Sequence, residues 1–232
     1  MPDWLSPEAA TALMLSLRVS LVATLASLPV GILVAYALAR GRFVGHGLLN
    51  GLVHLPLILP PVVTGYLLLL TFGRQGWIGA SLWDWFGFTF AFRWTGAALA
   101  AAVMAFPLLV RAIRLAIEAV DPRLEEAAST LGASRLVVFL TVTLPLILPG
   151  IIAGAVLAFA KAMGEFGATI TFVANIPGET QTLPTAIYAF LQVPGGDGAA
   201  LRLVAVSVVV AMVALAVSEG LSRRVARRIA GK

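Results

Sequence analysis

The chain has 232 residues, of which 60% are hydrophobic and only 12% are charged, and its mean hydropathy is +0.98. Soluble domains carry about 25% charged residues, so this composition excludes an ordinary water-soluble protein and predicts an integral membrane protein. The net charge of +5 falls on arginines beside apolar segments, which membrane topology explains without nucleic acid as a partner, and the absence of cysteine excludes disulfides and thiolate chemistry.

Five apolar stretches reach the roughly 20 residues that a transmembrane helix needs. We therefore predict an all-α, polytopic membrane protein, with residues 1–232 as one domain because no linker interrupts the chain. The acidic start, with Asp3 and Glu8, lacks the basic region and cleavage site of a signal peptide, so the first span is expected to remain as an anchor. The predicted spans are 11–38, 48–72, 95–117, 146–173 and 199–217.

Basic residues predict the orientation of these spans, because they concentrate on the cytoplasmic side of a membrane. They cluster after the first, third and fifth spans, whereas the opposite segments carry few. This pattern predicts an N-terminus outside and a C-terminus in the cytoplasm, and an odd number of spans agrees with termini on opposite sides. The cytoplasmic set is Arg40, Arg42, Arg111, Arg114, Arg123, Arg135, Arg223, Arg224, Arg227, Arg228 and Lys232, and the sparse outer set is Arg74, Arg93 and Arg202.

Two outer segments are too polar or too interrupted to be spans. Residues 77–94 hold four tryptophans, which are typical of a membrane interface, and predict an interfacial or re-entrant helix that would raise the helix count to six. Residues 175–198 are rich in proline and glycine and predict a loop with a short helix over 184–192.

Prolines and glycines predict local features inside the spans. Pro56, Pro60 and Pro61 must distort the second span, either as a wall beside a polar pathway or as a static kink. Gly150 and Gly154 have the GxxxG spacing, which favours close helix packing over a hinge.

A charged, helix-forming insert separates the third and fourth spans. Asp121 and Pro122 form an N-cap and a first helical residue, and Gly132 can end the helix that follows. A second helix starts near Ser134 and enters the membrane through Leu144 and Pro145. Two short helices bent at Gly132 should therefore present a surface for a partner. Its predicted contact residues are Glu125, Glu126, Ala127, Ala128 and Gly132.

The spacing from Glu126-Ala127-Ala128 through Gly132 and Val142 to Leu144-Pro145 resembles the EAA loop of binding-protein-dependent ABC importer permeases. We call residues 118–145 the coupling loop. The resemblance implies that this loop docks into a cytoplasmic ATPase. Val142 stands where the family more often has isoleucine, a change that keeps the side chain apolar. The alternative is a solvated hairpin that merely connects two spans.

Residues 161–169 and 175–184 are similar to the corresponding segments of the molybdate permease branch of that family. Sulfate permeases have a similar sequence around residues 164–167, but their chains are usually longer. The resemblance implies a type I ABC importer permease fold in the cell inner membrane. It also implies a homodimer, two cytoplasmic ABC ATPase subunits that bind ATP and Mg, and an external or periplasmic oxyanion-binding protein. This chain itself is expected to bind no cofactor and no metal.

Lys161 and Glu165 lie one helical turn apart in the fourth predicted span, near the middle of the bilayer. Charges there are costly unless paired, so we expect the two to pair. They either line the path of an anion or fix helix packing. Gly164 and Thr169 would add donors to such a pathway. Arg18, in the first span, is expected to be an interhelix partner rather than a substrate ligand.

The chain has no Walker A sequence, so it is not expected to be an ATPase itself. The leading hypothesis is therefore a permease that carries molybdate, or the similar tungstate, inward with energy from a partner ATPase. A sulfate permease is the nearest alternative. An ion-coupled secondary transporter and a non-transporting scaffold are the others, and both leave the coupling loop without a purpose.

Overall fold

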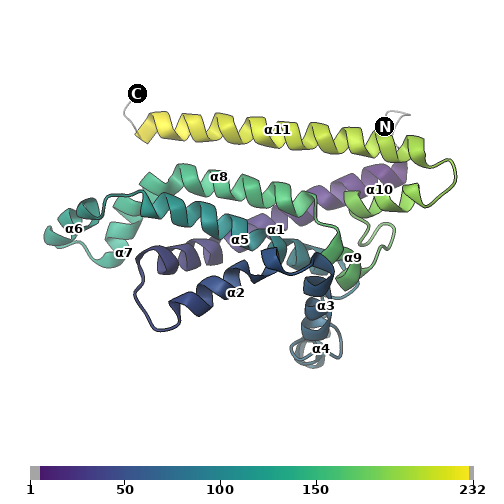
Figure 1. The fold of residues 1–232 in the computed structure, drawn as a ribbon, viewed down its shortest axis with the longest axis horizontal. Helices are drawn as coiled ribbons and strands as arrows, with labels where there is room; N and C mark the ends of the chain where they lie inside the picture. The colour runs from purple at the N-terminus through teal and green to yellow at the C-terminus, as the bar shows by residue number, and fades with distance from the viewer. Residues whose placement is uncertain (1–5, 230–232) are drawn as a thin grey trace.

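The computed structural model describes residues 6–229, and within that range every regular element is a helix (Figure 1). The predicted all-α class is therefore confirmed. Asp3, used above in the argument about a signal peptide, and Lys232, used for topology, lie outside the described residues. In chain order the helices are α1 (Pro7–Arg40), α2 (His46–Ile58), α3 (Pro61–Phe72), α4 (Gly79–Phe86), α5 (Trp94–Glu118), α6 (Pro122–Thr130), α7 (Arg135–Val138), the π-helix η1 (Phe139–Thr143), α8 (Leu144–Met163), α9 (Gly167–Val173), α10 (Leu183–Leu191) and α11 (Asp197–Ile229).

Within the described residues, four helical segments are long and apolar enough to cross a membrane, and the bent pair α2–α3 would make a fifth. Helix α5 is the most buried of the four and packs between α1 and α8, whereas α11 lies along α8 and α10 (Figure 1). The start of α1 and the end of α11 lie at opposite ends of the bundle (Figure 1). This arrangement agrees with an odd number of crossings.

Small residues let α5 approach its neighbours closely. A Cβ on Gly150 would clash with the Cβ of Ala116, and a Cβ on Gly154 would lie 3.1 Å from the Cβ of Ala112. Close packing of small residues is the main source of helix association in lipid, where there is no hydrophobic drive between helices. The packing interpretation of the GxxxG spacing is therefore confirmed.

The second predicted span, 48–72, is not one helix. Helices α2 and α3 meet at a bend of 116°, and α3 projects from the bundle with α4 at its tip (Figure 1). Leu59 and Pro60 both have extended backbones, because a residue that precedes proline is driven out of the helical region. Pro60 and Pro61 also lack N–H donors. The prolines thus divide the predicted span into two helices that run in different directions, instead of kinking one continuous helix.

The fourth predicted span, 146–173, is also divided. Helix α8 ends at Met163, residues 164–166 are not helical, and the short α9 packs against α3 and α5. A Cβ on Gly167 would lie 2.8 Å from the Cβ of Pro61, so α9 sits directly on the start of α3. The two prolines and the break after α8 therefore meet at one place in the fold.

A short helix lies in each of the two segments that were expected outside the membrane. Helix α4 lies in the tryptophan-rich segment, where the Arg74 guanidinium stacks 4.0 Å from the ring centre of Trp83. Helix α10 begins one residue before Pro184. The Ser16 hydroxyl of α1 accepts a hydrogen bond of 2.6 Å from the Leu183 N–H, which ties α10 to the bundle.

Candidate functional site

The coupling loop folds as two short helices with a bend between them, as predicted. Asp121 Oδ1 accepts a hydrogen bond of 3.0 Å from the N–H two residues later, and Pro122 takes the first position of α6, where a missing N–H removes no helical bond. Gly132 has a φ of +88°, a left-handed conformation in which a Cβ is unfavourable. Ser134 caps α7 by accepting a hydrogen bond of 3.4 Å from the N–H three residues later.

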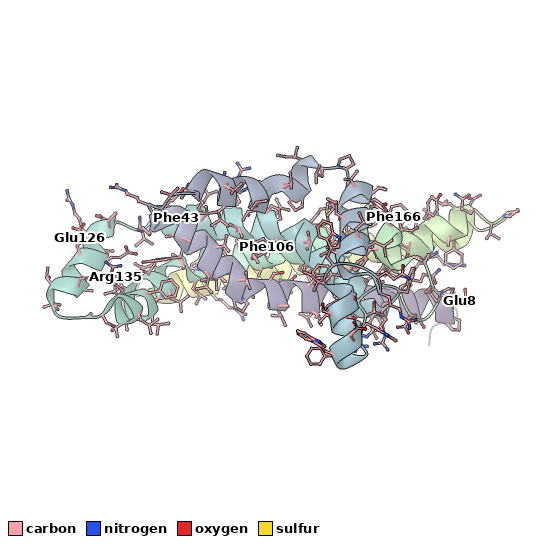
Figure 2. The ribbon with its side chains drawn as sticks, turned by 90° about the horizontal axis from the view of Figure 1, so that it is seen from below. Glu8, Phe43, Phe106, Glu126, Arg135 and Phe166 are labelled. Atoms are coloured by element: carbon pink, nitrogen blue, oxygen red, sulfur yellow. The ribbon has the colours of Figure 1, made fainter. Side chains whose placement is uncertain are left out.

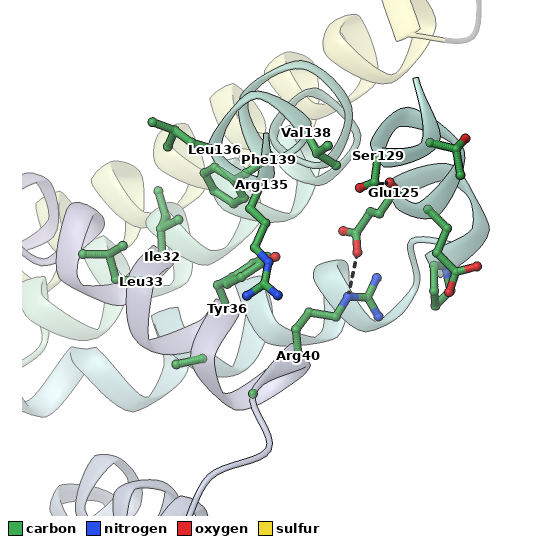
Figure 3. Close-up of a pocket in the computed structure, with 15 residues that line it drawn as sticks. Ile32, Leu33, Tyr36, Arg40, Glu125, Ser129, Arg135, Leu136, Val138 and Phe139 are labelled. Carbon is green, nitrogen blue, oxygen red and sulfur yellow. Dashed lines mark hydrogen bonds and ion pairs between the residues drawn. The ribbon is translucent and has the colours of Figure 1, made fainter. Parts of the chain in front are cut away.

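A polar clasp, made by Arg40, Glu125 and Thr143, joins the coupling loop to the end of α1. Arg40 Nε lies 3.3 Å from Glu125 Oε2, an ion pair without hydrogen-bond alignment (Figure 3). The Thr143 hydroxyl donates to Glu125 Oε1 at 2.7 Å, and Arg40 Nη2 donates to the Val120 carbonyl at 2.9 Å. Glu125 is therefore held by Thr143 from the end of the loop and by Arg40 from α1, and Arg40 is itself tied to the start of the loop.

Glu125 and Glu126 differ in exposure and in their contacts, although both border the space between α1 and the loop. Glu125 is half-buried in the clasp, whereas Glu126 is exposed at the far end of the molecule, opposite Glu8 (Figure 2). Ala127 is exposed and Ala128 is half-buried, and no residue of α6 is buried. Helix α6 thus leaves Glu126 and Ala127 open to a partner, and Glu125 connects the helix to the bundle. That these residues dock into an ATPase remains a prediction.

A cavity of about 970 Å³ lies between the last turns of α1 and the coupling loop (Figure 3). Leu33, Tyr36 and Phe139 are among its apolar residues, and the rings of Tyr36 and Phe139 meet edge to face at 5.3 Å. Arg135 points into it from α7 (Figure 3). Arg40 and Glu125 of the clasp line one side of this cavity. Because the cavity separates the loop from α1, the two make few direct contacts elsewhere.

A π-helical turn, η1, connects α7 to α8 and was not predicted. The Leu144 N–H bonds to the Phe139 carbonyl, five residues back. Pro145 explains the wider turn, since its ring would clash with the carbonyl of Thr141 in a regular α-helix and it has no N–H to offer. The π turn places the buried Thr143 against Glu125.

Lys161 and Glu165 form the expected ion pair, with Lys161 Nζ 2.8 Å from Glu165 Oε2. Glu165 stands just beyond α8, in the break before α9, and not inside a continuous helix. Its Oε1 accepts a hydrogen bond of 3.0 Å from the Ala168 N–H, in the first turn of α9. Only 2% of the Glu165 side chain is exposed, against 30% for Lys161. The carboxylate therefore holds α8 and α9 together and leaves the lysine accessible.

The other two candidate pathway residues differ in exposure. Gly164 caps the end of α8 and is exposed, and a Cβ there would meet nothing closer than 3.8 Å. Thr169 is buried in α9 with 1% of its surface exposed. Of the four candidates, Lys161 is thus the one whose charged side chain reaches open space.

Sequence reasoning missed the clasp. Arg40 was used only as a marker of topology, and Thr143 received no role. Glu125 was assigned to the partner surface because its neighbours in sequence belong to the EAA pattern. No local signal pairs Arg40 with Glu125, since the two are far apart in the chain and only the packing of α1 against the loop brings them together.

Arg40→Gln should loosen the coupling loop, because it removes the charge opposite a half-buried carboxylate, at an expected cost of about 1–2 kcal/mol. Hydrogen exchange of the α6 amides should therefore become faster than in the unaltered chain. Arg42→Gln is the matched control, since Arg42 is exposed and lies two residues away. Equal exchange in the two variants would show that the clasp does not hold the loop.

Comparisons with known proteins agree with these features. Residues 27–229 match the family model described as binding-protein-dependent transport system inner membrane component. The chain is 59% identical to the molybdenum transport system permease protein ModB of Escherichia coli (strain K12) over 231 residues, which cover 100% of this chain and 98% of that protein. It is 35% identical to the sulfate transport system permease protein CysT of Salmonella typhimurium, over 97% of this chain and 81% of that protein.

Among solved structures, the fold resembles a bacterial ABC transporter involved in the import of the acidic polysaccharide alginate. The TM-score is 0.75 at 20% identity, over 94% of this chain and 80% of that one. At this identity the likeness concerns the fold alone.

Proposed function

This chain belongs to the binding-protein-dependent transport system inner membrane components, and we propose that it is the permease that carries molybdate inward in an ATP-driven importer. The observation that supports molybdate as the substrate is the 59% identity to the molybdenum permease of Escherichia coli along the whole chain. Tungstate, which has the same charge and shape, is expected to use the same path. Sulfate is the weaker candidate, because the sulfate permease relative is only 35% identical.

In this proposal two copies of the chain enclose the path, and each coupling loop faces the cytoplasm. One ABC ATPase subunit, which binds ATP and Mg, grips each α6. The geometry supports this arrangement, since α6 has no buried residue and stands at one end of the bundle (Figure 1). An external oxyanion-binding protein would deliver the substrate at the other end. No ATPase site is assigned to this chain.

Movement of α6 would reach the bundle through two connections. One is the clasp, which ties Glu125 to Arg40 on α1. The other is η1, which continues into α8 and so to the ion pair of Lys161 and Glu165 at its far end. ATP-driven closure of the ATPase pair would thus displace α1 and α8 relative to each other. Both helices also pack on α5, which would serve as the fixed core.

Reconstitution of the chain with its ATPase and binding protein in liposomes tests the proposal. Uptake of labelled molybdate should require ATP and both partners. Unlabelled tungstate should compete about as well as unlabelled molybdate. Sulfate should compete at least about tenfold less well, which corresponds to a binding free energy weaker than that of molybdate by about 1.4 kcal/mol. Uptake by the chain alone, driven by an ion gradient, would instead identify a secondary transporter.

A further inference from the structure

A second cavity, of about 500 Å³, lies at the end of the bundle opposite the coupling loop. Three segments surround it: the first half of α1, the residues that lead into α5, and the loop before α10. We call it the outer pocket. It is lined by Leu15, Arg18, Phe88, Arg93, Trp94, Thr95, Gly178 and Glu179.

Two arginines line the outer pocket, and neither forms an ion pair with a described residue. The Arg18 guanidinium lies 3.7 Å from the ring centre of Trp94 on α5, so Arg18 contacts another helix, as expected. A role for the same side chain in binding an anion departs from the expectation stated above. Arg93 stands 5.7 Å over the ring of Phe88. Stacking uses the face of a guanidinium and leaves its N–H edge for hydrogen bonds, the arrangement that suits a planar fork to an oxyanion.

Thr95 supplies a third polar group to the outer pocket. Its Oγ1 is buried and has no hydrogen-bond partner among the described residues, although it lies in the first turn of α5. A buried hydroxyl without a partner is unfavourable by about 1–3 kcal/mol, so rotation of the Thr95 side chain toward an oxyanion in the pocket would be favoured. The N-terminus of the 25-residue α5 adds a positive dipole end at the same place.

One carboxylate, Glu179, also lines the outer pocket. With Arg18 and Arg93 it leaves a net charge of +1 around the cavity, so an anion is attracted but not held tightly. A site that receives a substrate must also release it, and a nearby like charge serves that purpose. The cavity has room for a small anion together with water, whose share of liquid volume is about 30 Å³ per molecule.

We infer that the outer pocket binds one tetrahedral oxyanion between Arg18, Arg93 and the Thr95 hydroxyl. Its identity as transported substrate rests on the proposed function. The phosphate of a lipid headgroup has the same chemistry, and the tryptophans of the neighbouring segment are typical of the lipid interface. The recognition itself is the same for both, because it depends on charge and on N–H and O–H donors.

Equilibrium binding of labelled tungstate to the full chain, purified in a maltoside detergent without ATPase, tests this inference. Arg18→Gln and Arg93→Gln should each weaken binding by about tenfold or more, since each removes a charge-assisted hydrogen bond. Glu179→Gln should tighten binding by about threefold. Arg74→Gln is the matched control. Arg74 also lies over a tryptophan ring, that of Trp83, but is outside the pocket, so its replacement should leave the affinity for tungstate unchanged.

The source of the anion follows from native mass spectrometry of the same preparations. If the site holds a lipid, the unaltered chain and Arg74→Gln retain one phospholipid that Arg18→Gln and Arg93→Gln lose, and tungstate does not bind. Equal binding of both ligands in all variants would overturn the inference. Because no transport step is measured, this failure is distinct from failure of the proposed function, which ATP-driven uptake reports.

Discussion

Glu126→Lys should abolish co-purification of the chain with its ATPase and with it ATP-driven uptake. Glu126 is exposed on α6, at the end of the molecule, and forms no ion pair with a described residue, so its carboxylate is open to a cationic partner group. Reversing the charge replaces attraction with repulsion. Loss of a close charge pair at an interface costs about 2–5 kcal/mol, which weakens binding by about 30-fold or more.

The matched control for this prediction is Glu8→Lys. It makes the same charge reversal at the opposite end of the bundle (Figure 2), where no ATPase is expected. Pull-down of the ATPase and its activity in the complex measure the result. Normal assembly and uptake with Glu126→Lys, or equal loss with Glu8→Lys, would contradict the docking role of α6.

Gly132→Pro tests the bend independently of charge. Proline requires a φ near −65°, whereas Gly132 has +88°, and its N–H donates to the Ser129 carbonyl at 3.0 Å. The substitution should therefore misdirect α6 while Glu126 remains. Helical content and detergent stability of the bundle should change little, because Gly132 is exposed and nothing lies within 4 Å of its would-be Cβ. Assembly should still fail.

The coupling loop was predictable because its signals are local. An Asp-Pro start, a glycine end and a serine cap specify two helices and a bend within a few residues. Helix α10 was predictable for the same reason. The partners of Glu125 were not, because Arg40 and Thr143 come close only after α1, α6 and η1 have packed. The docking surface remains a prediction, to which the structure adds that one of its two carboxylates, Glu125, lies in the clasp.

The long apolar stretches predicted five spans, of which the described residues show four as long helices and the fifth as the bent pair α2–α3. Hydropathy sums over a window and does not register a turn, so residues 48–72 were predicted as one span although the chain turns through 116° at Pro60 and Pro61. In 146–173 the break at Gly164 was hidden by apolar residues on both sides. The residue that marks this break is Glu165. Its buried carboxylate accepts a hydrogen bond from an N–H in the first turn of α9, and that N–H would already be bonded in an uninterrupted helix.

Lys161→Met should reduce molybdate uptake by about tenfold or more while the complex still assembles. Lys161 is the candidate whose charged group reaches open space, and a positive charge beside a path raises the local concentration and entry rate of anions by 10- to about 1,000-fold. The substitution also leaves the buried Glu165 with the Ala168 N–H as its remaining partner. That should lower stability by about 2–3 kcal/mol, less than for a fully buried pair because Lys161 is 30% exposed.

The double variant Lys161→Met with Glu165→Gln separates transport from packing. A neutral amide no longer needs the lysine, and its oxygen still accepts from Ala168, so the thermal midpoint should return close to that of the unaltered chain. If Lys161 lines the pathway, uptake stays low although stability recovers. If the pair only fixes α8 against α9, uptake recovers together with the midpoint. We expect the first result, because the structure buries the carboxylate and exposes the lysine, and a purely structural pair has no need of that asymmetry.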